Sequence, residues 1–178
     1  MSAGSVDPYR CDPAGSSETS AGRGAQKVQV SLRTVSSDDF DFGFEVTEFA
    51  MRDYIEQTWG LWDDALHRRH HAATFTPDTH QVILVAGERA GILAVEQHPE
   101  HVRLEKLYLL PGARNRGVGS QVLRSVMQPA IASGRPVRLR VLAVNTPAQR
   151  FYARHGFVVV AATPERLFME AGGSGADS

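Results

Sequence analysis

The sequence predicts an α/β (α+β) domain built on a mixed, mostly antiparallel sheet of about 6–7 strands, flanked by about four helices. Three apolar runs, at 81–86, 92–97 and 102–110, are separated by short turns, which is typical of consecutive antiparallel strands. The third run is followed by a helical pattern at 121–131 and an alternating strand pattern at 137–141. This strand–helix–strand order requires a parallel pair within the sheet.

The two ends of the chain differ in composition from the middle. Residues 1–26 are rich in Ser, Gly, Ala and Asp and show no apolar periodicity, so we expect a disordered tail. Residues 171–178 have the same character. The folded domain is therefore predicted to span residues 27–170.

The first elements of this domain are a strand and a pair of helices. Val28, Val30 and Leu32 alternate with polar residues, as in a half-buried strand. The stretch 40–71 has a helical pattern, interrupted at 59–62 around a glycine that disfavours a helix interior. We therefore expect two helices joined by a short break.

Three histidines, His67, His70 and His71, lie within one helical turn of each other near the end of this stretch. Two of them could hold a metal ion, but further ligands are missing nearby and arginines separate them. A solvated helix face explains them better, so no metal site is predicted.

The last elements are a helix and two strands. The segment 146–156 has a capping residue, an early proline and a closing glycine, which predict a short helix. Two apolar stretches, 157–162 and 167–170, then predict a closing antiparallel pair.

The segment 114–120, Arg-Asn-Arg-Gly-Val-Gly-Ser, joins the third strand to its helix. Its glycines allow a ligand to approach the backbone, and the helix N-terminus favours an anion such as phosphate. A P-loop is excluded because no Lys follows Gly119, and a dinucleotide fingerprint is excluded because Val122 replaces its third glycine. Another phosphate-bearing ligand remains, with a plain glycine turn as the alternative.

The pattern Arg-x-x-Gly-x-Gly at 114–119 resembles motif A of the GNAT N-acetyltransferase superfamily. The pattern Asn-x-x-Ala-x-x-Phe-Tyr-x-x-x-Gly-Phe at 145–157 resembles its motif B, and the likeness extends over about 27–170. The resemblance implies a sheet whose central parallel strands splay apart, with acetyl-CoA as acetyl donor. The cofactor-binding residues that it implies are Leu107, Leu109, Arg114, Asn115, Arg116, Gly117, Val118, Gly119, Ser120, Asn145 and Tyr152.

The resemblance also nominates residues for the chemistry. Tyr152 is expected to protonate the coenzyme A thiolate, although a tyrosine of a packed helix is the alternative. Glu105 interrupts an apolar strand and is the expected base, unless it only pairs with a neighbouring arginine. Glu96 on the adjacent strand is the second candidate, expected in substrate binding. Some protein-modifying members carry a Glu where this chain has Arg140, which argues against transferring their mechanism.

The helix break is the expected acceptor pocket. Glu56, Trp59 and Trp62 gather there, and two aromatic rings beside carboxylates could hold a cationic amine. The alternative is that the tryptophans only anchor the helices to the sheet.

Composition excludes several other classes of protein. The 19 basic and 20 acidic residues give a net charge of −1, so nucleic-acid binding is not expected. The single cysteine, Cys11, cannot form an internal disulfide. No run is long enough to span a membrane, and no signal peptide is evident, so a cytoplasmic monomer or homodimer is expected.

Together these patterns predict an N-acetyltransferase that moves an acetyl group from acetyl-CoA to a primary amine by direct attack, in a ternary complex. The acceptor is expected to be a small molecule. Two alternatives remain open from the sequence. One is a related acyltransferase with another acyl donor or a protein or peptide acceptor, and the other is a non-catalytic module that senses coenzyme A.

Overall fold

The computed structural model describes residues 27–173. The predicted N-terminal tail with Cys11, and residues 174–178 of the predicted C-terminal tail, lie outside the described residues. The strands are β1 (Val30–Thr34), β2 (His80–Val85), β3 (Glu88–Gln97), β4 (Val102–Leu109), β5 (Val137–Leu142), β6 (Val158–Ala162) and β7 (Arg166–Ala171). The helices are α1 (Phe40–Trp59), α2 (Asp64–Thr74), α3 (Val118–Ala132) and α4 (Thr146–Arg154), with 3-10 turns η1 (Ser37–Asp39) and η2 (Pro111–Ala113).

The described strands form one 7-stranded sheet in the order β1-β2-β3-β4-β5-β7-β6. Only the β4–β5 pair is parallel among them, and the other neighbours are antiparallel. The predicted fold class is therefore confirmed. Strand–helix–strand connectivity through α3 produces the single parallel pair, because the helix returns the chain to the start of the next strand.

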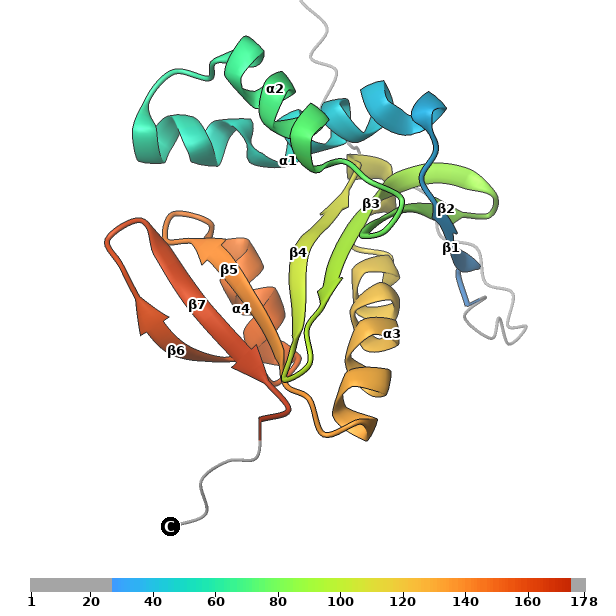
Figure 1. Ribbon diagram of the computed structural model, residues 1–178, viewed down its shortest axis with the longest axis vertical. Coiled ribbons are helices and arrows are strands. Elements are labelled where there is room, and N and C mark those ends of the chain that lie inside the picture. Colours follow the sequence, from blue (N-terminus) through green and yellow to red (C-terminus); the bar gives the residue numbers. More distant parts are fainter. Residues whose placement is uncertain (1–26, 174–178) are drawn as a thin grey trace, which may run out of the picture.

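The parallel strands separate soon after they begin. Residues 102–104 of β4 pair with 137–139 of β5, and no further pairs follow, although β4 continues to pair with β3 as far as Leu109. Figure 1 shows the two strands together at the bottom of the sheet and apart towards α1. The upper half of β4 therefore has one edge without a strand partner.

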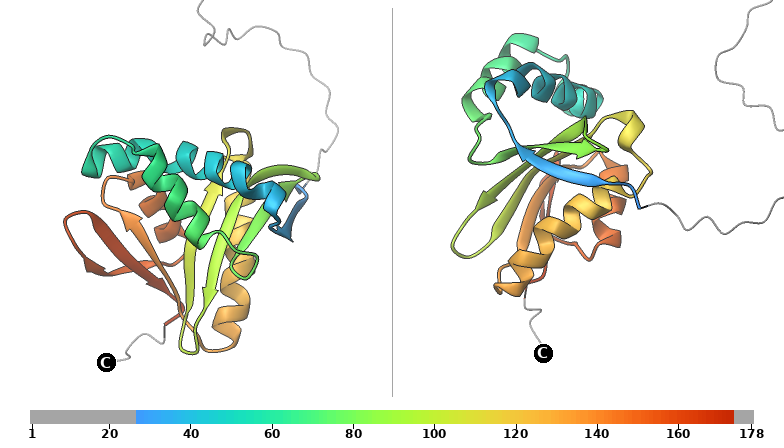
Figure 2. Two further views of the ribbon diagram at one scale, coloured as in Figure 1. Left: turned by 45° about the horizontal axis from the view of Figure 1, so that its top comes forward. Right: turned by 90° about the vertical axis from the view of Figure 1, so that its right-hand side faces the viewer.

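The helices cover the sheet from two sides. Figure 2 shows α1 and α2 on one side, with α3 and α4 on the other. The larger apolar core lies against α3, whose residues Val118, Val122 and Leu123 are fully buried. A smaller cluster lies under α1, around Val46 and Ile92. Both clusters arise because each helix buries its apolar stripe against the apolar face of the strands.

The boundaries match the sequence prediction with small differences. α1 ends at Trp59, and Gly60 follows with a φ of 97°, so the predicted break is present. α3 begins at Val118, earlier than the predicted Gln121, because Gly117 already turns the chain into the helix with a φ of 77°. Pro129 does not end this helix, which continues to Ala132, since a proline near the last turn removes only one backbone donor.

No helix within residues 27–173 has the length and apolar character needed to cross a membrane.

Candidate active site

The loop between β4 and α3 presents an open helix N-terminus. Gly117 and Asn115 both have left-handed backbone conformations, with φ of 77° and 56°, and these turn the chain sharply into α3. No side chain caps the start of α3. The first backbone N–H groups of the helix therefore remain available to an anion, which the helix dipole also favours.

The two glycines of the loop serve different purposes. A Cβ at Gly117 would meet no atom within 4 Å, but its positive φ strains any other residue. A Cβ at Gly119 would lie 3.3 Å from the Phe151 ring of α4, closer than ordinary contact. Gly119 therefore lets α3 and α4 approach each other beside the loop.

The loop arginines hold the loop to its surroundings. Arg114 donates from Nε to the carbonyl of Leu109 at 2.9 Å, and its guanidinium lies 5.3 Å from the centre of the Phe49 ring. Arg116 donates to the carbonyl of Gly112 at 3.1 Å. Each guanidinium keeps further N–H groups that no hydrogen bond within residues 27–173 uses, and these suit phosphate oxygens.

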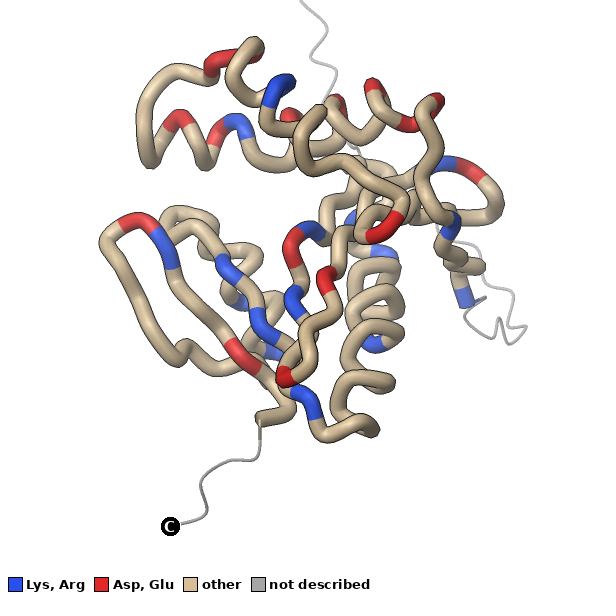
Figure 3. Tube along the Cα trace, viewed as in Figure 1, with Lys and Arg blue, Asp and Glu red and all other residues tan. Residues whose placement is uncertain are grey.

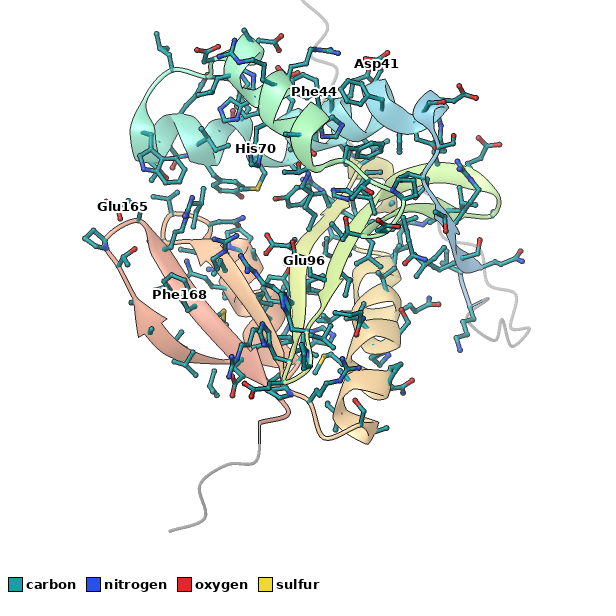
Figure 4. The ribbon with its side chains drawn as sticks, viewed as in Figure 1. Asp41, Phe44, His70, Glu96, Glu165 and Phe168 are labelled. Carbon is teal, nitrogen blue, oxygen red and sulfur yellow. The ribbon has the colours of Figure 1, made fainter. Side chains whose placement is uncertain are left out.

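The space between the separated strands continues into a cavity of about 1070 Å³, covered by α1 and α2. Side chains of the helix pair and of β4 project into this space in Figure 4. The predicted site residues among those that line it are Trp59, Glu105, Leu107, Leu109, Arg114, Asn115, Gly117, Gly119, Ser120, Asn145 and Tyr152. The structure therefore brings most of the predicted cofactor loop and both predicted catalytic residues to one cavity.

Some predicted site residues lie elsewhere. Val118 is fully buried in the core, so only its backbone can meet a ligand. Arg116 and Glu56 are not among the lining residues. Glu96 on β3, labelled in Figure 4, is also outside the lining and lies 3.2 Å from the His98 ring.

Tyr152 is held in place by aromatic neighbours. Its ring packs edge-on against Phe151 of α4 and against Phe157, with centroid distances of 5.2 and 5.5 Å. Burial raises the pKa of Tyr152, and the nearby Tyr108 raises it further. The phenol therefore stays protonated at neutral pH and can only donate a proton. Asn145 caps the N-terminal end of the helix that carries Tyr152, because the Asn145 side chain accepts a hydrogen bond from the N–H of Ala148 at 3.2 Å.

Glu105 lies where β4 begins to part from β5. It is the extra residue of a β-bulge, because Leu104 pairs with Val95 and Lys106 pairs with Ala94. Its carboxylate is ion-paired with Arg103 of the same strand and with Arg140 of β5, the latter at 3.1 Å. The ion pair with a neighbouring arginine, which was the alternative explanation of Glu105, is therefore present in the structure. Glu105 also lines the cavity.

Tyr108 is a residue of this site that the sequence interpretation did not select. Burial raises the pKa of Tyr108 to about 12, with a further contribution from the Glu105 carboxylate. Tyr108 lines the same cavity as Glu105, Arg140 and Tyr152. One available signal was the row of charged and polar residues at 103, 105, 106 and 108 in a strand that otherwise reads as apolar.

The helix break contributes two side chains to the cavity, Trp59 and Trp62. Glu56 instead pairs with Arg52 at 3.1 Å and accepts the backbone N–H of Trp62 at 3.2 Å, which stabilises the turn between the helices. Trp59 lines the cavity, and the guanidinium of Arg166 lies 5.1 Å from the centre of its ring. A cation of the protein therefore already lies near the Trp59 ring.

A family model supports the resemblance of the two motifs. Residues 78–159, from the turn before β2 through the loop and α4 into β6, match the model described as an acetyltransferase (GNAT) domain. This match contains the cofactor loop and every catalytic candidate named above.

Curated relatives and solved structures agree. Uncharacterised N-acetyltransferases of Mycobacterium tuberculosis and Mycobacterium bovis are 34% identical over 92 residues, which is 49% of this chain and 59% of theirs. The matched region thus spans little more than half the length of these relatives. The crystal structure of the PaiA N-acetyltransferase of Thermoplasma acidophilum with coenzyme A superposes with a TM-score of 0.61 at 18% identity, covering 80% of this chain and 98% of that one. The ribosomal-protein-S18-alanine N-acetyltransferase of Escherichia coli gives 0.61 at 14% identity, covering 80% and 93%.

The sheet has one splayed parallel pair, an uncapped glycine loop stands at its opening, and Tyr152 lines the same cavity. Residues 78–159 thus resemble a GNAT acetyltransferase domain, and the chain shares its fold with solved acetyltransferases.

Proposed function

We propose that this protein transfers an acetyl group from acetyl-CoA to the primary amine of a small molecule, by direct attack within a ternary complex. The observation that carries the proposal is the uncapped start of α3, which opens onto the same cavity as Tyr152 and Glu105. Acetyl transfer from acetyl-CoA requires a binding site for the phosphates of the coenzyme and a proton donor for its sulfur. One cavity here has a candidate for each.

Acetyl-CoA binding is proposed along the gap between β4 and β5. The pyrophosphate would accept hydrogen bonds from the backbone of residues 117–120, and Arg114 and Arg116 would neutralise its negative charge. The pantetheine arm would lie beside the half of β4 that has no partner on its β5 side, where Leu107 and Leu109 are found. Backbone groups of β4 that have no β5 partner can form hydrogen bonds with the amides of the pantetheine arm. These bonds would satisfy polar groups of the protein and of the cofactor. The complex of the Thermoplasma acidophilum relative with coenzyme A supports this choice of cofactor.

The chemistry needs no further reactant. The amine nitrogen forms a bond to the thioester carbon, and the carbon–sulfur bond breaks. The amine loses a proton, for which Glu105 is the proposed acceptor, and the coenzyme A sulfur gains one. Tyr152 is the proposed donor to that sulfur, since its raised pKa keeps the phenol protonated.

The test is calorimetric titration with acetyl-CoA followed by thiol release against a broad amine panel, with products identified by mass. We expect saturable acetyl-CoA binding and thiol release that depends on both the protein and an amine. Binding without thiol release for any amine would instead support a coenzyme A sensor. Faster release from a longer acyl-CoA would support another donor.

A further inference from the structure

The charged side chains that line the cavity are mostly basic, even without Arg114 of the cofactor loop. Its cationic lining residues are Lys106, Arg114, Arg140, Arg150, Arg154 and Arg166, against the carboxylates Asp53 and Glu105. Figure 3 shows Lys and Arg on the traces of β4 and β5, and residues of both strands line the cavity. A polyamine would be repelled there, whereas a substrate that also carries negative charge would be attracted.

Lys106 is a partly buried cation of the cavity. It lies on β4 just beyond the last residue that pairs with β5, and it lines the cavity. The carboxylate of the neighbouring Glu105 is ion-paired with Arg103 and Arg140. Within residues 27–173 no hydrogen bond or ion pair reaches the Lys106 ammonium, and burial lowers its pKa. A charge held away from water without a partner is costly, so a ligand anion would remove an existing penalty.

The helix wall of the same cavity has unpaired polar atoms. The Trp62 indole N–H and the His71 Nδ1 are buried and have no hydrogen-bond partner in the described part of the chain. Both residues line the cavity, and both rings pack near Phe44, at 6.4 and 5.7 Å between centroids. Burial, with the nearby Lys106, lowers the pKa of His71 to about 4, so its ring is neutral and can accept a hydrogen bond. The wall therefore contains one donor and one acceptor whose hydrogen bonds are not made within the described residues.

We propose that the acceptor is an amine that also carries a carboxylate, such as an amino acid, and that Lys106 binds this carboxylate. Trp62 and His71 would hydrogen-bond other polar groups of the same molecule. The inference rests on the proposed N-acetyltransferase function and narrows its substrate class. A carboxylate fits better than a phosphate, because Lys106 is a single point charge while the nearby guanidiniums of Arg140 and Arg166 already have partners.

The test is thiol release with acetyl-CoA on matched sets of amines. Each set contains an amino acid, its carboxamide, the amine without the acid group, and the phosphonate analogue. We expect the wild type to prefer the carboxylate over the carboxamide by at least about 10-fold in kcat/KM. In Lys106→Met the KM for the carboxylate should rise about 10- to 100-fold, as for loss of a charged hydrogen bond, with the acetyl-CoA Kd within about twofold.

Lys27→Met is the matched control, because Lys27 is the other lysine of the chain and is exposed. It should leave the preference unchanged. If Lys106→Met is poorly folded in a melting experiment, Lys106→Gln provides the same comparison with a polar side chain. Calorimetric binding of the amino acids to the protein with coenzyme A present gives a readout that needs no turnover.

Three results would overturn the inference: equal use of carboxylate and carboxamide, a better substrate without a carboxylate, or an unchanged preference in both Lys106 variants. Absence of any amino carboxylate binding in the calorimeter would overturn it as well. Failure of the proposed function has a different signature, which is no acetyl-CoA binding and no thiol release with any amine.

Discussion

Two buried histidines should make the protein sensitive to mild acid. The exposed fractions of His71 and His80 are 3% and 4%, and their rings flank Phe75 at centroid distances of 4.6 and 5.1 Å. Burial, with a smaller effect of Lys106, lowers the pKa of each imidazole to about 4 from its ordinary 6.5. Between these values the unfolded chain binds protons that the folded chain does not. The free energy of unfolding therefore falls as the pH falls from 6.5 towards about 4.

The expected size of the effect is large. One pKa unit corresponds to about 1.36 kcal/mol, so each imidazole accounts for roughly 3 kcal/mol across the window. With both titrating, the slope approaches about 2.7 kcal/mol per pH unit near the middle of the window. A domain is typically stable by only about 5–15 kcal/mol. Asp39, whose pKa is lowered first by its hydrogen bond from Arg33, loses its contribution only at lower pH, starting near its ordinary value of 3.8.

The assay is urea unfolding followed by circular dichroism, at steps from about pH 7.5 to about pH 4. His71→Gln keeps an N–H group near the Phe40 carbonyl that His71 Nε2 contacts at 3.0 Å. His80→Asn keeps a polar group near the Thr79 hydroxyl, 2.8 Å from Nδ1. Each variant should remove about half of the pH slope, whereas His70→Gln on the exposed face of α2 should leave it intact. A wild type whose stability is level over this range, or variants that keep its slope, would refute the reasoning.

The other predictions concern ligand binding and turnover. Gly117→Val and Gly119→Val should each abolish calorimetric acetyl-CoA binding, the first by strain at a φ of 77° and the second by collision with the α4 wall; unchanged affinity in both would remove the loop from the cofactor site. Tyr152→Phe should lower kcat by about 10²–10⁴ with acetyl-CoA affinity within a few fold, and a wild-type rate with chemistry limiting would make the residue structural. Trp59→Phe should raise the acceptor KM and leave that for acetyl-CoA unchanged, whereas Glu56→Gln, which lies outside the cavity lining, should change neither. The opposite pattern would move the acceptor pocket towards the helix break.

The elements of this fold and its cofactor loop could be predicted from local patterns. The signals for these elements each lie within a few neighbouring residues: the apolar runs of β2, β3 and β4, the glycine at the end of α1, and the caps of α4. The loop at 114–120 is similarly local, because its function depends on glycine conformation and on the helix that it begins. Two such patterns in the right order also carried the resemblance to the GNAT superfamily.

The acceptor side of the cavity was not predictable in this way. A charged residue in a strand has the same sequence signature whether it is solvated, ion-paired or unpaired, and its partners come from distant segments. Arg140 of β5 reaches Glu105 of β4, and Arg166 of β7 reaches Trp59 of α1. Glu56, which was predicted to help bind a cationic amine, instead stabilises the turn between the helices, and the charged residues that line the cavity are mostly basic.

By itself, the sequence determined the order of strands and helices, the single parallel pair and the loop for an anionic cofactor. Those properties follow from periodicity and backbone preference, which act over a few residues. Only the tertiary structure decided that Lys106 makes no ion pair within residues 27–173, that Tyr108 lines one cavity with Tyr152, and that His71 and His80 are neutral at physiological pH. Charge pairing and desolvation depend on which surfaces meet when the helices close over the sheet, and one stretch of sequence does not contain that information.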